Sequence, residues 1–103
     1  MKIYLHEFNI WKNEITTKEI EAEETEKTYS YPYNEYLMAN VSKERIGKLD
    51  GVYGGFMYTL TPDRTPFIDA LLESNANKIN RLTSQLKTLE ERRTFLLAER
   101  SKQ

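Results

Sequence analysis

The C-terminal third of the chain carries an apolar repeat that restricts the fold more than any other feature. After Pro66 no glycine or proline interrupts the sequence, and apolar side chains recur at alternating intervals of four and three residues, which is the heptad spacing of helices that pair with helices. The spacing predicts a helix over residues 66–99, about 34 residues or roughly 50 Å long. We call its repeating positions the seam, which consists of Ile68, Leu72, Asn75, Ile79, Leu82, Leu86, Leu89, Arg93 and Leu96.

Such a helix is about twice as long as a preceding segment of about 65 residues can cover. The seam is therefore predicted to be covered by copies of the same chain, in a homo-oligomeric coiled coil or helical bundle. Isoleucine and leucine are mixed along the seam, so dimers, trimers and tetramers all stay open. The weak helix propensity of residues 74–77 leaves an alternative, in which the helix breaks there and folds back as a hairpin.

The seam contains two polar residues, Asn75 and Arg93. A polar residue in a heptad seam fixes register, and this is one interpretation of Asn75. Arg93 can extend its guanidinium out of a fraying last turn into solvent. The other interpretation is that one or both side chains face a ligand cavity between subunits.

The segment before the helix is predicted to be rich in β-structure. Residues 2–11 place apolar side chains on both faces, which indicates a strand covered on both sides, or a strand with one side covered by a partner. A tight turn at residues 12–13 and a strand over residues 14–24 follow. Residues 27–33 favour an extended chain in which Pro32 indicates a sheet edge.

Turn and cap signals organise the rest of this segment. Residues 42–48 are predicted to form a short helical turn, capped by Ser42 and ended by Gly47. A turn at residues 50–51 leads to a last strand over residues 52–60, in which the Gly54-Gly55 pair indicates a bulge or a close backbone approach. Residues 61–64 form a turn, and Thr65 is expected to cap the long helix with Pro66 in its first position.

These elements predict an α+β fold, a small antiparallel β-sheet followed by a long C-terminal oligomerisation helix. Residues 1–65 form the β-rich head and residues 66–103 the helix, within a single domain overall. The charge is divided along the chain. Residues 1–75 hold 8 Lys/Arg and 13 Asp/Glu, a net of −5, and residues 76–103 hold 7 Lys/Arg and 3 Asp/Glu, a net of +4.

Composition narrows the setting and the chemistry. There is no cysteine, no apolar run of membrane-spanning length and no signal-peptide pattern, so we expect a cytoplasmic protein without a membrane partner. The net charge of −1 makes nucleic acid an unlikely partner. His6 is the only histidine, and we expect it to be a residue of a strand face. No nucleotide-binding loop or nucleophile motif is present, so we expect no enzyme and no cofactor.

The glutamates in the second half of the second predicted strand and just after it have two interpretations. They form a solvated edge that discourages sheet-to-sheet aggregation, or, less simply, a cation site. These residues are Glu19, Glu21, Glu23, Glu24 and Glu26.

The binding residues form a richer set. The chain has 7 tyrosines, 4 phenylalanines and 1 tryptophan, most of which we expect in the core or in interfaces. Around the junction of strand and helix, rings, amides and guanidinium groups gather in sequence. Rings stack on bases, amides read polar edges and arginines pair with phosphates, although a solvated helix face explains the same residues. This set is Tyr58, Arg64, Phe67, Asn75, Asn77, Lys78, Asn80 and Arg81.

Two segments carry a resemblance. Residues 19–29 (EIEAEETEKTY) and 42–48 (SKERIGK), followed by the terminal heptad helix, resemble small prophage proteins of low-GC Gram-positive bacteria. The order of a β-rich front and a C-terminal helix also resembles the anti-Thoeris sponge proteins of phages. That resemblance implies a homo-oligomer that sequesters cyclic ADP-ribose isomers or related cyclic nucleotides without cleaving them, in the cytoplasm of an infected or lysogenic bacterial host.

The sponge family's layout implies an aromatic residue, an asparagine and arginines near subunit interfaces. Phe67 and Asn77 match the first two. The family places two arginines one turn apart on the terminal helix, whereas here Arg92 and Arg93 are adjacent and Arg100 follows nearly two turns later. We expect eight residues to bind the ligand. They are Tyr58, Arg64, Phe67, Asn75, Asn77, Arg81, Arg92 and Arg93.

Three functions remain open from the sequence. The first is the phage sponge for a cyclic nucleotide signal. The second is an oligomeric protein-binding inhibitor or adaptor of a host or phage protein, whose acidic front could mimic nucleic acid. The third is a nucleic-acid binder that uses the basic tail, in which glutamates interrupt the basic residues.

Overall fold

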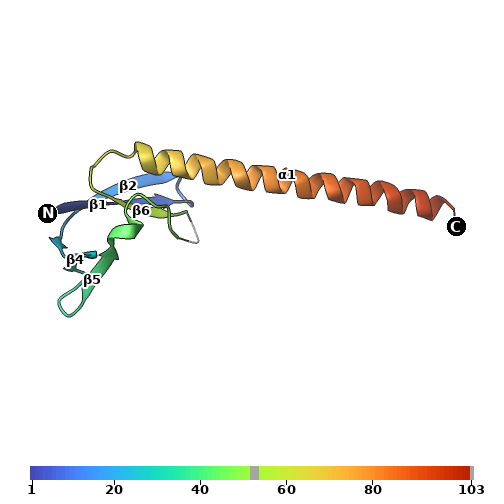
Figure 1. The fold of residues 1–103 in the computed structure, drawn as a ribbon. Coiled ribbons are helices and arrows are strands. Elements are labelled where there is room, and N and C mark those ends of the chain that lie inside the picture. The colour runs from blue at the N-terminus through green and yellow to red at the C-terminus, as the bar shows by residue number, and fades with distance from the viewer. Residues whose placement is uncertain (52–53, 103) are drawn as a thin grey trace. The chain divides into compact units, whose positions relative to one another are not determined.

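The computed structural model describes residues 1–51 and 54–102 and has the predicted α+β class, with small antiparallel sheets followed by one long helix (Figure 1). The chain divides into two compact units, Met1–Leu71 and Leu72–Gln103. The first unit contains two three-stranded sheets and the first turns of the helix, and the second unit contains the rest of the helix, which ends at Ser101.

The first sheet has the strand order β2-β1-β6, with β1 (Lys2–Asn9) at its centre. β1 pairs antiparallel with β2 (Glu14–Glu21) and with β6 (Phe56–Thr59). The predicted turn between the first two strands is confirmed, since Asn13 adopts a positive φ of 50° and the Lys12 N–H donates to the Asn9 carbonyl oxygen.

A second sheet corrects the prediction of a single sheet. The strand predicted over residues 14–24 ends at Glu21, and after the buried Ala22 the chain enters β3 (Glu23–Glu24). β3 pairs with β4 (Thr28–Pro32), which pairs with β5 (Met38–Ser42). The sequence did not predict β5, because its residues, Met-Ala-Asn-Val-Ser, show little apolar alternation.

The prediction for Pro32 is confirmed at that residue, which has a strand neighbour on one side only. β4 as a whole is nevertheless the central strand of its sheet. Pro32 is tolerated because it is the last residue of β4 and pairs only with Met38, while β3 reaches no further than Ser30. The missing N–H therefore removes no hydrogen bond to a third strand.

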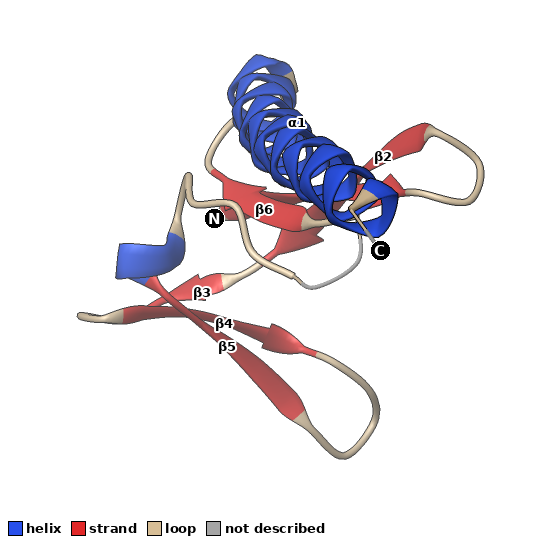
Figure 2. Cartoon of the chain, turned by 90° about the vertical axis from the view of Figure 1, so that its right-hand side faces the viewer, coloured by secondary structure: helices blue, strands red, loops and turns tan. Residues whose placement is uncertain are grey.

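Each face of β1 contains one fully buried side chain, which agrees with the prediction of cover on both sides. On one face Ile3 is fully buried in a core with Ile20, Tyr29 and Val41, which joins the two sheets. On the other face His6 is fully buried against Phe67 of the helix. Figure 2 shows the two sheets together with the helix that begins beside the first one.

The short helical turn and the glycine pair follow the prediction. A 3-10 helix spans Lys43–Arg45, Ser42 Oγ accepts the Glu44 N–H, and Gly47 follows with a φ of 77°. Gly54 has a φ of 72°, and a Cβ there would overlap the Phe8 carbonyl oxygen. The predicted close backbone approach is therefore confirmed. Residues 52–53, where the last strand was predicted to begin, lie outside the described residues.

The long helix, α1 (Thr65–Ser101), is continuous. This decides against the predicted alternative of a break at residues 74–77. The capping residue differs from the prediction, because α1 begins at Thr65 itself and the Asp63 carboxylate accepts the Thr65 N–H at 3.0 Å. That contact holds the pKa of Asp63 below its usual range. Within residues 1–51 and 54–102, no helix is both long and apolar enough to cross a bilayer.

Candidate binding site on the long helix

The eight residues predicted to bind a ligand fall into two groups. The first group is Tyr58, Arg64 and Phe67, which lie in the first unit, and the second is Asn75, Asn77, Arg81, Arg92 and Arg93, which lie on α1 in the second unit.

The three side chains of the first group contact other residues of the first unit. Phe67 is fully buried, with its ring stacked on His6 at 5.8 Å between centroids. Arg64 Nε donates to Thr17 Oγ1 at 2.7 Å, and the Tyr58 hydroxyl lies 2.9 Å from that of Tyr31. Burial, followed by the bond to Tyr31, raises the pKa of Tyr58. The Phe67 ring therefore exposes no face on which a ligand could stack.

His6 is the centre of a polar network that the sequence did not reveal. Its Nε2 lies 2.7 Å from Thr59 Oγ1, and because that hydroxyl donates to the Thr61 carbonyl oxygen, it must accept the Nε2 proton. Nδ1 lies 2.9 Å from Thr17 Oγ1, which accepts from Arg64 and can therefore donate to Nδ1. The network assigns His6 as a neutral imidazole with both nitrogens satisfied.

The electrostatics of His6 agree with this assignment. Burial, and then the positive charge of Arg64, lower the pKa of His6 below its ordinary value. A fully buried, fully hydrogen-bonded imidazole is a structural group that joins β1, β2, β6 and the start of α1.

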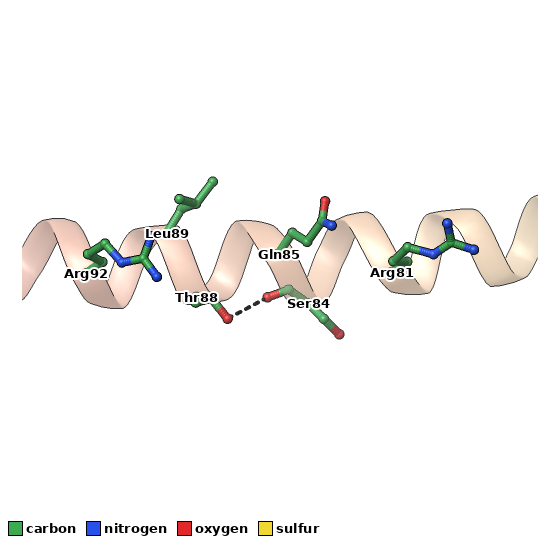
Figure 3. Close-up of a pocket in the computed structure, with 6 residues that line it drawn as sticks. All are labelled: Arg81, Ser84, Gln85, Thr88, Leu89 and Arg92. Carbon is green, nitrogen blue, oxygen red and sulfur yellow. Dashed lines mark hydrogen bonds between the residues drawn. The ribbon is translucent and has the colours of Figure 1, made fainter.

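The second group contributes to two hollows on the surface of α1. Arg81 and Arg92 lie three turns apart at the two ends of a hollow of about 580 Å³ (Figure 3). Arg93 contributes to a second hollow of about 380 Å³ together with Leu96 and Arg100. Asn75 and Asn77 are exposed and line neither hollow. The residues between the two arginines of the first hollow are Ser84, Gln85, Thr88 and Leu89.

The first hollow combines groups that suit an anionic, partly apolar ligand. Its two guanidinium groups are phosphate-binding groups, the Gln85 amide can read polar edges, and Leu89 supplies apolar surface. The Thr88 hydroxyl donates to the Ser84 carbonyl oxygen at 3.1 Å. Because one helix supplies every lining residue, the hollow is open to solvent and has only one wall.

Leu89 also belongs to the seam, so the hollow borders the seam directly. The seven apolar seam residues are exposed by between 37% and 62% of their surface. Phe95 and Leu97, next to the seam, are exposed by 60% and 44%. Together they form an exposed apolar stripe, interrupted by Asn75 and Arg93, that is larger than the singly scattered apolar residues of an ordinary protein surface.

The acidic edge has the solvated character that was the simpler interpretation. Glu19 pairs with Lys2 at 3.6 Å, Glu21 with the N-terminal amino group at 3.0 Å, and Glu24 with Lys43 at 3.0 Å. In the part of the chain that the structure describes, no group of three or more histidine or acidic residues is arranged to hold a metal ion.

Two loop tips in the first unit expose apolar side chains. Trp11, in the β1–β2 turn, is 86% exposed. The β4–β5 hairpin exposes Tyr36 and its neighbours, and Asn34 fixes the tip, since its Oδ1 accepts the N–H groups of Tyr36 and Leu37.

Comparisons of the chain with protein-family models, with curated proteins and with solved structures find no match.

Proposed function

We propose that the protein is a non-catalytic homo-oligomer that sequesters a cyclic nucleotide immune signal between subunits, as a phage counter-defence sponge. The observation that carries the proposal is the exposed apolar seam of α1 with an arginine-lined hollow along its border. The proposed setting is the cytoplasm of an infected or lysogenic bacterium, and the resemblance of residues 19–29 and 42–48 to prophage proteins supports it.

The seam supports the oligomeric part of the proposal on energetic grounds. Full burial of one leucine or isoleucine side chain contributes about 1.5–3 kcal/mol relative to exposure. Seven side chains that are each about half exposed therefore offer on the order of 5–10 kcal/mol per chain. Two chains together offer about 10–20 kcal/mol, which is comparable with or larger than the typical entropic cost of association, about 4–15 kcal/mol.

The hollow supports the ligand part of the proposal. A ligand seated between Arg81 and Arg92 would be held by charge-assisted hydrogen bonds to its phosphates. A neighbouring helix on the seam would supply the second wall that the hollow lacks. The only histidine is buried in the first unit, so no imidazole base lies on this helix face. We therefore propose that the ligand is bound without being cleaved.

Calorimetry with cyclic ADP-ribose isomers and cyclic dinucleotides is the direct test. We expect binding at micromolar concentration or tighter and recovery of the intact ligand after denaturation. Replacing both arginines, R81Q/R92Q, should weaken binding at least 10-fold, whereas the control K87Q, which removes one charge outside the hollow, should change it less than 3-fold. Absence of binding to every one of these ligands at 100 μM would refute the proposed ligand class.

A second candidate function, an oligomeric protein-binding inhibitor or adaptor, is favoured by the exposed loop tips. Trp11 and Tyr36 are 86% and 89% exposed, and large exposed aromatics are typical anchors of protein interfaces. If this function is the correct one, pull-down of a host or phage protein will survive R81Q/R92Q and will be lost in W11S/Y36S.

A further inference from the structure

We infer that α1 pairs antiparallel with α1 of a second copy, in the register that sets Asn75 of each copy opposite Arg93 of the other. The inference rests on the proposed function in one respect, that copies of the chain cover the seam. It adds the direction and register of pairing, and it identifies the side of the pair on which an anion would bind.

The seam is complementary to itself when it is reversed. The register that sets Asn75 opposite Arg93 sets apolar residues opposite apolar residues at the other positions from Leu72 to Leu96. The pair then contains two polar layers, each formed by Asn75 of one copy and Arg93 of the other, and neither residue lies opposite a leucine. The apolar layers of this register are Leu72 with Leu96, Ile79 with Leu89, and Leu82 with Leu86.

A parallel, in-register pair treats the polar residues differently. It sets Arg93 against Arg93, two like charges in a partly desolvated seam. In the antiparallel register the Arg93 guanidinium can donate to the Asn75 side-chain oxygen, so that both polar groups have a partner. A polar residue in a seam selects the arrangement that satisfies it, and here that arrangement is antiparallel.

The direction of pairing also decides where the flanking charges lie. In an antiparallel pair, residues 71, 78, 85 and 92 of both copies, which directly precede seam residues, lie on one side of the seam. Residues 69, 76, 83 and 90 of both copies, which directly follow seam residues, lie on the other side. The first side then holds Lys78, Gln85 and Arg92 of both copies, and the second holds Asp69 and Glu90 of both copies. A parallel pair would instead mix the two sets on each side.

The first side is thus a cationic strip with Gln85 of both copies at its centre and Lys78 beside Arg92 of the other copy. Arg81 borders the same strip, because it lines the hollow with Gln85 and Arg92. None of the ion pairs found in residues 1–51 and 54–102 involves these cations. Neighbouring cations without counter-charges favour a bound anion, so the strip would take a ligand that carries at least two phosphates.

Cysteine cross-linking tests the register, because the natural chain contains no cysteine. N75C and R93C are prepared as separate proteins and oxidised with oxidised glutathione, alone and after mixing in denaturant and refolding. We expect disulfide-linked dimers in the mixture, at least 10-fold more than in either protein alone. Disulfide-linked dimers in each protein alone, with no enrichment on mixing, would show parallel pairing and overturn the inference.

N75C and R93C remove the polar residues on which the proposed register depends, so a second pair of variants leaves these residues in place. L72C and L96C are opposed in the proposed register and should again link only when mixed, whereas a parallel pair links each with itself. Light scattering of the unmodified protein separates the two proposals. A monomer overturns both the proposed function and this inference, while an oligomer with the parallel cross-linking pattern overturns this inference alone.

The cationic strip is tested with inorganic tripolyphosphate as the probe. We expect it to lower the dimer dissociation constant at least 10-fold, and K78Q/R92Q to abolish that effect, while K87Q keeps it. An effect of tripolyphosphate without binding of any cyclic nucleotide would support the strip and refute the sponge. A dimer dissociation constant that tripolyphosphate leaves unchanged would overturn the strip.

Discussion

At the scale of single residues, His6 shows how a lone titratable group can be structural. Both of its ring nitrogens are hydrogen-bonded to threonines, and its ring lies against Phe67. The sequence alone predicts a strand-face position for His6, and no more. Its partner Thr59 is 53 residues away, and such long-range contacts leave no local signal in the sequence.

The first prediction concerns pH. Because the pKa of His6 is lower in the folded chain than the ordinary value of 6.5, the unfolded chain takes up a proton first as the pH falls. The stabilisation that neutral His6 gives the folded chain is therefore fully present above about pH 6.5. It is lost as the pH falls from there through the pKa of His6 in the folded chain. Urea unfolding between pH 7.5 and 5 should show falling stability, and H6Q should lack this slope. An equal slope in H6Q would contradict the assignment.

The second prediction concerns the close backbone approach at Gly54. Its positive φ and the overlap of a Cβ with the Phe8 carbonyl oxygen both penalise a side chain. We expect G54A to destabilise the chain by about 2–4 kcal/mol in urea unfolding.

Gly47 is the matched control for Gly54. It has a similar φ of 77° but open space around its missing side chain, so G47A should cost only about 1 kcal/mol. Equal costs for the two variants would show that the contact with Phe8 is not the cause. Here the sequence predicts the feature, because a glycine pair within a strand pattern indicates a close approach, but it does not identify the partner.

At the scale of elements, α1 was the most predictable part of the chain and the second sheet the least. A long heptad repeat without glycine or proline leaves few alternatives to a helix. Residues 74–77 are helical as well, despite their weak helix propensity. The sequence does not predict the second sheet, because the acidic residues after Ile20 continue the alternating pattern of the strand before them. Ala22, which is buried where the two strands separate, is too small to change that apolar pattern. β5 lacks such a pattern altogether.

The third prediction tests the seam as an element. L86D places a carboxylate in the middle of the seam and should weaken association by about 2–5 kcal/mol per chain, with a fall in helix content by circular dichroism. T94D introduces the same charge on a different face of the exposed helix and should leave both association and helix content nearly unchanged. Equal effects of L86D and T94D would show that the seam is not the contact surface.

At the scale of the whole molecule, the sequence predicts the candidate binding site only in part. Spacing alone sets Arg81 and Arg92 on one helix face, since eleven residues complete about three turns, and the structure gathers them around one hollow. Spacing could not predict that Phe67, Arg64 and Tyr58 would be used inside the first unit. Their partners His6, Thr17 and Tyr31 come from distant strands.

The fourth prediction separates the two kinds of contact by their response to salt. The seam is apolar, so raising sodium chloride from 50 to 500 mM should leave the oligomer mass unchanged. Ligand binding depends on guanidinium groups in an open hollow, and screening over this range should weaken it at least 10-fold. An oligomer that dissociates in salt would point to pairing of the acidic and basic parts of the chain instead of the seam.

The most direct test of the account is the mass of the natural chain in solution, because every proposal depends on copies covering the seam. Light scattering of the folded protein at about 50 μM should give a whole-number multiple of the 12.2 kDa chain mass, at least twice that value. A mass of 12.2 kDa for a chain that retains its helix content would contradict the account.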